Sequence, residues 1–249
     1  MSKNLVFILL LSLLVSCTMG GYDTGDGEDS YYVAEMIDFN ISGTEVRKGV
    51  LDDSRTLVLE QPIKSSALKK IAQDSVNNYC RLMIHYNKKS AAADSVVAAA
   101  VGYNSVLMPK IVLADTVKSE IKTDPIALTS MWLASNKKYI NMDFAIMTDG
   151  AASKHHYLGL VCDSIVRRQQ STDIFIRISH NQNGHVAAYH EYCLMSISRK
   201  QLEKLVTDGG TKPTSLRAAG DAETDGLMPF KVIIGVPTFS GTATREFWL

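Results

Sequence analysis

The chain has 249 residues, 46% of them hydrophobic, and its 26 basic residues balance 26 acidic ones, so its formal net charge is zero. A neutral chain has no excess positive charge with which to recruit nucleic acid or anionic lipid, and we expect neither as a partner. The length and the apolar fraction suit one large or two modest globular domains.

The N-terminus has the layout of a bacterial lipoprotein signal. Lys3 precedes an apolar run from Leu5 to Val15, which is too short to span a bilayer, and small Ser16 and then Cys17 follow it. We expect cleavage after residue 16 and acylation of Cys17, with palmitate-type chains that each contribute roughly 0.8 kcal/mol of membrane affinity per buried methylene. A plain secretory peptide or an uncleaved anchor helix is the alternative, but no second hydrophobic segment follows.

Residues 17–30 form an acidic, Gly-rich tether, whose composition suits a flexible linker. Thr18 stands where an aspartate would signal retention in the inner membrane, so we predict the outer membrane. The chain could face the periplasm or the cell surface, and the sequence leaves both open.

Residues 31–114 alternate between apolar and polar side chains, which predicts strands with one buried face. A short helix is expected between them over Ser65–Ala72, with Leu68, Ile71 and Ala72 facing inward. Five strands with one inserted helix predict an OB-like barrel. The expected strands are Tyr31–Ile41, Glu45–Leu51, Arg55–Glu60, Tyr79–Asn87 and Val96–Val112.

Residues 115–249 predict an antiparallel β-sandwich of about six strands. Asn183-Gly184 is a hairpin signal, because a type I′ turn needs positive φ at both central residues. Such a hairpin would place Ile178 opposite Tyr189 and Ile174 opposite Cys193 in one sheet. A short helix is expected over Ser198–Val206 and a long loop over Thr207–Gly226. The expected strands begin at Ile140, His156, Thr172, Val186, Phe230 and Ala243.

Cys80, Cys162 and Cys193 accompany Cys17 in the mature chain. Their spacing matches no metal site, so three small core residues are the favoured interpretation. If a disulfide forms in the oxidising envelope, Cys162–Cys193 is the expected pair.

Catalytic signatures are missing from the sequence, including the serine nucleophile, zinc-protease, phosphate-loop and dinucleotide motifs. We therefore expect no enzyme, no cofactor and no metal centre. Glu191 would lie on the buried Ile176 face of the predicted hairpin, which is costly for an unpaired carboxylate. Either a bulge shifts the register, which we favour, or a nearby arginine pairs with Glu191. Five titratable residues could still form a catalytic site: Asp173, His180, His185, His190 and Glu191. If a structure brought three of them together in one cleft, the question of catalysis would be open again.

A ligand-binding surface is the remaining candidate. In the hairpin register Phe175 and Tyr192 are cross-strand neighbours on the outer face, and aromatic faces bind sugars. His180 and His185 flank the turn, where surface histidines are the usual outcome. The candidate surface comprises Phe175, Arg177, His180, His185 and Tyr192.

Five features stand out together: the lipoprotein signal at Cys17, Arg81–Tyr86, Val106–Lys110, Trp132 with Lys138–Phe144, and Ile176–Asn181. In this order, and over essentially the whole mature chain, they resemble the NigD-like lipoproteins. The resemblance implies an N-terminal OB-type domain, a C-terminal β-sandwich, and a protective or accessory role linked to a bacteriocin operon, with no catalytic residues to transfer. It predicts a non-enzymatic envelope protein that binds a protein or a glycan, or else an immunity or scaffold protein that acts on a protein partner.

Overall fold

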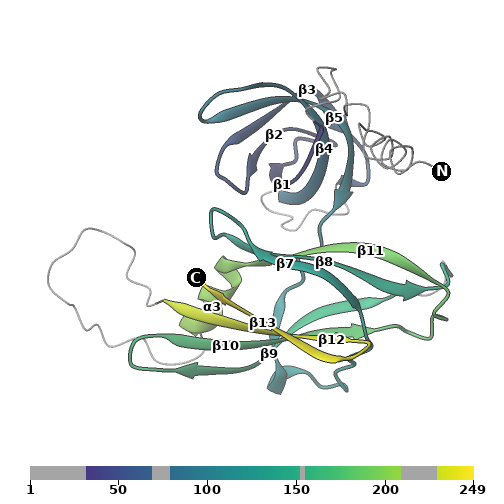
Figure 1. Ribbon diagram of the computed structural model, residues 1–249, viewed down its shortest axis with the longest axis vertical. Coiled ribbons are helices and arrows are strands. Elements are labelled where there is room, and N and C mark those ends of the chain that lie inside the picture. Colours follow the sequence, from purple (N-terminus) through teal and green to yellow (C-terminus); the bar gives the residue numbers. More distant parts are fainter. Residues whose placement is uncertain (1–31, 69–78, 152–154, 209–228) are drawn as a thin grey trace, which may run out of the picture.

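The structure is a computed structural model that describes residues 32–68, 79–151, 155–208 and 229–249. Two β domains follow one another along the chain, a barrel and then a sandwich (Figure 1). The predicted signal peptide and tether, including Cys17, lie outside the described residues.

The N-terminal domain is a closed five-stranded barrel, as the alternating pattern predicts, with strand order β1-β2-β3-β5-β4. β3 and β5 are parallel, and the other pairs in the barrel are antiparallel. Side chains such as Phe39, Leu57 and Leu82 are fully buried inside it. This is the OB-like arrangement. The strands are β1 (Tyr32–Asn40), β2 (Glu45–Leu51), β3 (Thr56–Lys64), β4 (Tyr79–Ala91) and β5 (Ser95–Ser105).

The helix expected from Ser65 is described only at its start. Ser65 Oγ accepts a hydrogen bond from the amide of Ala67 at 3.2 Å, and Leu68 is fully buried, as an inward-facing residue should be. The rest of this predicted helix, from residue 69 onward, lies outside the described residues.

The C-terminal domain is a sandwich of two sheets, with strand orders β13-β12-β10-β9-β6 and β11-β8-β7. Their inner faces share one core that includes Phe144, Ile176 and Val232. Helix α3 (Arg199–Asp208) follows β11 as predicted and places Leu202 in that core. The strands are β6 (Ile111–Leu113), β7 (Ala127–Leu133), β8 (Tyr139–Thr148), β9 (Tyr157–Arg167), β10 (Thr172–Asn181), β11 (Tyr189–Ser198), β12 (Phe230–Thr238) and β13 (Gly241–Trp248).

Three details differ from the prediction. β6, which lies within the residues predicted for the barrel, pairs with β9 of the sandwich. β7 has no counterpart among the predicted strands. The sandwich is also not purely antiparallel, because β6 runs parallel to β9 and β10 runs parallel to β12. The expected loop over Thr207–Gly226 falls almost entirely on residues that the structure does not describe.

The predicted β10–β11 hairpin is wrong, although the turn itself forms. Asn183 has φ 52° and Gly184 has φ 73°, the positive values that the turn requires. β10 pairs on its two edges with β9 and β12, whereas β11 pairs with β8 in the other sheet. Both edges of β10 are therefore occupied, and the chain crosses between the sheets after the turn.

This crossover also corrects the expectation for Glu191. β11 pairs with β8 over its whole length without a register shift, so no bulge is present. Glu191 is exposed because the first four residues of β11 extend beyond the packed core. The three described cysteines are free thiols, with Cys80 and Cys162 buried and Cys193 partly buried.

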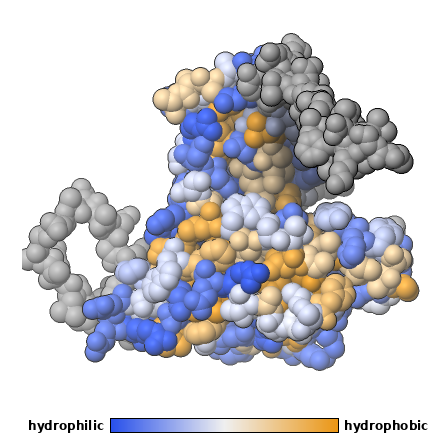
Figure 2. Space-filling model, in the orientation of Figure 1, coloured by the Kyte–Doolittle hydropathy of each residue, from blue (hydrophilic) through white to orange (hydrophobic). Residues whose placement is uncertain are grey.

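The barrel stands on the outer face of the three-stranded sheet, above β7, β8 and β11 (Figure 1). The linker crosses the edge of β11, where the Leu107 amide donates to the Leu194 carbonyl and the Ser196 amide donates to the Leu107 carbonyl, both at 2.8 Å. In the space-filling view the barrel is a narrower column on a broader base (Figure 2). The two domains thus meet at a recessed junction.

Candidate functional site

Arg81, on β4, is the centre of the junction between the domains. Its side chain is fully buried and donates to Asp38 Oδ1 at 2.6 Å and to Asp52 Oδ1 at 2.7 Å, both in the barrel. It also donates to Ser196 Oγ at 2.9 Å and Asn141 Oδ1 at 3.1 Å, both in the sandwich. One guanidinium group therefore links both domains through charge-assisted hydrogen bonds.

Two tyrosines complete this interdomain cluster. The Arg81 guanidinium carbon lies 3.9 Å from the centre of the Tyr139 ring, and the Tyr139 hydroxyl donates to Asp38 Oδ2 at 2.9 Å. Tyr79 and Tyr139 share a hydrogen bond between their hydroxyl groups. Burial and the Asp38 carboxylate raise the pKa of Tyr139 to about 12, so the hydroxyl stays a donor at neutral pH. The cluster therefore links the barrel to the sandwich through hydrogen bonds and a ring contact.

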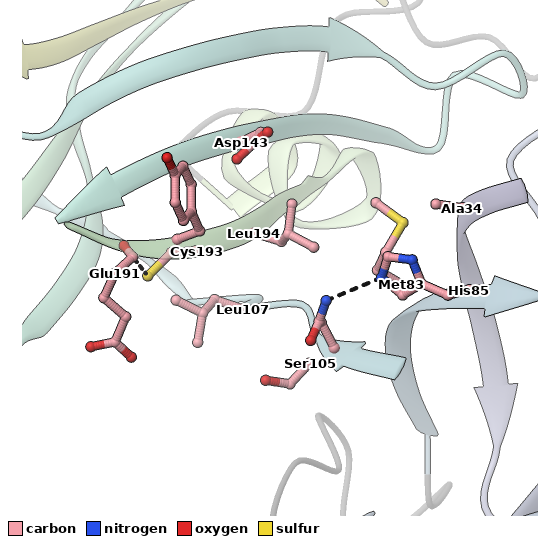
Figure 3. A pocket seen from close by; sticks show the side chains of 11 residues that line it. Ala34, Met83, His85, Ser105, Leu107, Asp143, Glu191, Cys193 and Leu194 are labelled. Carbon is pink, nitrogen blue, oxygen red and sulfur yellow. Dashed lines mark hydrogen bonds between the residues drawn. The ribbon is translucent and has the colours of Figure 1, made fainter. Parts of the chain in front are cut away.

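A pocket of about 650 Å³ opens beside this cluster, between the barrel and the outer face of the three-stranded sheet (Figure 3). Its barrel wall comes from β1, β4 and β5, and the linker residue Leu107 closes one side. The remaining wall comes from β8 and β11. The lining residues are Ala34, Met83, His85, Asn104, Ser105, Leu107, Asp143, Glu191, Tyr192, Cys193 and Leu194.

Strand alternation explains why polar groups face this pocket. Asn141, Asp143 and Ala145 lie on the face of β8 opposite the core residues Met142 and Phe144, as the sequence predicts. β11 follows the same rule, since Met195 and Ile197 enter the core while Ser196 bonds to Arg81. Tyr192 has the same parity as Ser196 and is 77% exposed at the pocket rim.

The barrel wall is held by its own hydrogen bonds. His85 contacts the Tyr32 hydroxyl through Nδ1 at 2.9 Å and the Asn104 amide nitrogen through Nε2 at 3.2 Å. Tyr32 stacks on the His85 ring, with 6.0 Å between ring centroids. Burial raises the pKa of the Cys193 thiol to about 12, so this lining group stays protonated. The pocket therefore offers two carboxylates, an amide, hydroxyls and an aromatic rim for hydrogen bonding and stacking.

The five residues of the predicted binding surface are not brought together. Phe175 and Arg177 lie on the outer face of the five-stranded sheet, where Arg177 pairs with Asp163 at 2.7 Å. His180 and His185 are buried. Tyr192 alone lines the pocket. The hairpin prediction placed Phe175 beside Tyr192. This placement is wrong, because β10 and β11 belong to different sheets.

The two buried histidines form a stacked cluster with His156 at one end of the sandwich. Ring centroids are 5.2 Å apart for His156 and His180, and 4.2 Å apart for His156 and His185. His180 Nδ1 donates to the Asp124 carbonyl, so His180 Nε2 accepts from His156 Nδ1 at 3.0 Å. His185 Nδ1 lies 2.6 Å from Asp149. Burial lowers the pKa of His156 and of His180, which favours neutral rings.

The five titratable residues that could have formed a catalytic site, Asp173, His180, His185, His190 and Glu191, do not meet in one cleft. Asp173 is at the start of β10, where it pairs with Arg168 at 2.7 Å, and His180 is near the other end of that strand. Glu191 lines the interdomain pocket. Within the described ranges, no group of three or more His, Cys, Asp or Glu side chains is placed to hold a metal ion.

Residues 109–214 match the family described as the NigD-like C-terminal beta sandwich domain. Over these residues the sandwich is similar to the NigD-like domain. This match begins in the linker, before β6, and it confirms the resemblance stated from the sequence motifs. A search of curated proteins gave no match.

Solved structures share the NigD-like fold. A NigD-like immunity protein from Bacteroides caccae is 19% identical, with a TM-score of 0.56 over 86% of this chain and 91% of that one. A Bacteroides fragilis protein named "Putative lipoprotein" is 11% identical, with a TM-score of 0.53 over 87% of this chain and 96% of that one. A Bacteroides vulgatus protein of unknown function is 16% identical, with a TM-score of 0.56 over 88% of this chain and 90% of that one. At these identities the likeness shows the fold, including both domains.

Sequence reasoning missed the pocket and the Arg81 cluster. A charged residue between Cys80 and Leu82, within the otherwise apolar first half of β4, is the one signal that could have indicated a buried ionic centre. The pocket had no such signal, because its lining comes from five separate segments.

Proposed function

We propose that this chain is a lipid-anchored outer-membrane protein that acts by binding a ligand and not by catalysis, and that the interdomain pocket is the binding site. The observation that supports this is the pocket itself, a recess of about 650 Å³ between two domains that buried Arg81 holds in place. A preorganised recess with convergent polar groups is the usual form of a ligand site. The described part of the chain has no helix long and apolar enough to cross a membrane.

The anchor is supported by the run from Leu5 to Val15 that ends at Ser16-Cys17. The name of the Bacteroides fragilis structure, which shares the fold, agrees with it. The test is Cys17→Ser with fractionation of the cell envelope. We expect the wild-type chain to incorporate labelled fatty acid and fractionate with outer membranes, and the variant to do neither. A wild-type chain found free in solution at full length would overturn the anchor.

The binding site is tested with the purified mature chain on a glycan array and against immobilised envelope proteins. Tyr192→Ala removes the exposed rim ring and should abolish retention of whichever ligand binds. Tyr157→Ala is the matched control, because Tyr157 is 59% exposed on β9 in the other sheet. Equal loss with both variants, or no loss with Tyr192→Ala, would exclude the pocket.

A second candidate function is an immunity or scaffold role exerted through a protein partner. The name of the Bacteroides caccae structure favours it, since that protein is called an immunity protein and shares both domains. Deletion of the gene should then sensitise cells to a bacteriocin-type toxin, and the full-length gene should restore survival. Unchanged sensitivity, together with glycan retention on the array, would favour the first candidate.

A further inference from the structure

β11 has an edge that is only partly occupied. It is the outer strand of its sheet, with β8 on one side. On the other side the linker residue Leu107 bonds to the Leu194 carbonyl and to the Ser196 amide. Toward the N-terminal end of β11 this contact ends, because the residues before Leu107 belong to β5 of the barrel. Along Tyr189–Cys193, no backbone bond to another segment of the described chain is made on that side.

The direction of the backbone groups follows from these two bonds. Along a strand, the amide and carbonyl of successive residues point alternately to the two neighbouring positions. Because Leu194 and Ser196 direct their groups toward the linker, His190 and Tyr192 direct theirs to the same open side. Glu191 and Cys193 instead bond with β8. The open edge therefore presents two donors and two acceptors, in line with the pairing that Leu107 already makes.

This edge has little of the usual protection. Natural edge strands carry charged side chains, especially lysine, or proline or a bulge that prevents pairing with another chain, and here Glu191 is the single Asp, Glu, Lys or Arg residue along Tyr189–Cys193. The segment Tyr189–Cys193 has no lysine or proline, and β11 has no register shift against β8. Its first four residues are exposed, with Tyr189 at 52% and Tyr192 at 77%. The exposed edge at these four residues is therefore accessible to a further strand.

The acidic residues beside this edge determine which side chains an added strand should carry. Asp143 and Glu191 bring two carboxylates to the pocket, and its described lining includes no lysine or arginine. Figure 3 shows Glu191 and Leu107 on the same side of β11, where an added strand would run. On one face of that strand a basic side chain would find the Glu191 carboxylate, and on the other face aromatic or aliphatic side chains would meet Tyr192 and Leu194.

We propose that the NigD-like chain binds an extended segment of a partner protein, which adds as a strand to β11 at Tyr189–Cys193 and places a lysine or arginine side chain in the interdomain pocket. This rests on the proposed binding function and names the class of its ligand. Backbone pairing gives the affinity and the acidic pocket gives the selectivity.

The probe is a phage-displayed random heptapeptide library selected on the purified mature chain. We expect peptides with alternating β-branched or aromatic residues and one lysine or arginine. N-methylation at alternate residues of a selected peptide should weaken binding about tenfold or more, because it removes donors to the open edge. N-methylation at the intervening residues should leave the dissociation constant within about twofold. Equal effects at all positions would overturn strand addition.

Variants of Tyr192 separate backbone pairing from side-chain stacking. Tyr192→Pro removes an amide that points away from β8, so the sheet stays intact. It should weaken peptide binding about tenfold more than Tyr192→Ala does. Equal losses for the two variants would show that only the ring matters and would overturn the proposal.

Hydrogen exchange of the wild-type chain keeps the test independent of any variant that folds poorly. The amides of His190 and Tyr192 should exchange rapidly in the free protein and become protected when the peptide binds, while those of Glu191 and Cys193 are protected throughout. Slow exchange of Tyr192 in the free monomer, or a dimer that buries this edge, would overturn the proposal. Glycan retention without peptide binding would also overturn it while leaving the binding function intact. Binding of neither would reject both.

Discussion

Substitution of Arg81 should uncouple and destabilise the two domains. Arg81→Met keeps much of the buried aliphatic volume but leaves Asp38 and Asp52 facing each other without their shared cation. The Arg81 side chain is 0% exposed, and the two carboxylates are 15% and 21% exposed. Removing one partner of a buried ion pair costs about 3–5 kcal/mol. Because residual water reaches both carboxylates, we expect about 3 kcal/mol, at the lower end of that range.

The assay is urea unfolding followed by two signals. Both tryptophans, Trp132 and Trp248, lie in the sandwich, so their fluorescence follows the unfolding of that domain, while circular dichroism follows both domains. The two transitions should coincide in the wild type and separate in Arg81→Met. Arg177→Met is the matched control, since Arg177 and Asp163 form a pair with exposures of 37% and 39%. Its cost should stay below about 1 kcal/mol. Similar costs for both variants, with coincident transitions, would refute this role for Arg81.

Three further predictions concern other parts of the molecule. Burial lowers the pKa of His156 and His180 below 6.5, so as the pH falls the unfolded chain takes up protons before the folded chain does. The free energy of unfolding should therefore be full above about pH 6.5 and fall below it. His180→Asn should flatten the slope of the urea midpoint against pH. Gly49→Ala should cost about 1–3 kcal/mol, because a Cβ would lie 2.6 Å from Ile37 and 2.8 Å from the Asp38 carbonyl. Gly102→Ala, which meets nothing within 4 Å, should change the melting temperature little, and equal shifts would contradict the argument. Burial raises the Cys193 pKa to about 12, so iodoacetamide at pH 8 should label it far more slowly in the native chain than in urea; equal rates would contradict its burial.

Much of the fold could be predicted because burial imposes a period of two on each strand. The alternation of Ile140, Met142, Phe144 and Ile146 with Asn141 and Asp143 placed the two faces of β8 correctly. Leu202 and Leu68 were likewise correct as inward-facing residues. These signals are local, since each depends on residues only a few positions apart.

Sheet membership could not be predicted in the same way. The Asn183-Gly184 turn has the expected backbone, yet its flanking strands join different sheets, because β12, more than 45 residues later in the chain, occupies the edge of β10. That competition depends on contacts distant in sequence, and it moved Tyr192 away from Phe175. The Arg81 cluster is equally non-local, since Ser196 lies 115 residues from Arg81. Polar residues that satisfy one another across domains leave no periodic signal.

The position of Tyr32 has a consequence for where binding can occur. Tyr32 is the first residue that the structure describes, and its ring stacks on His85 in the pocket wall. About fifteen residues join it to Cys17, so the two residues lie at most roughly 50 Å apart. On the proposed anchoring of Cys17 in the bilayer, partners confined to the same leaflet would meet this recess by lateral diffusion in two dimensions. Co-confinement of that kind raises their effective concentration, so weak pairing at β11 would suffice for stable association.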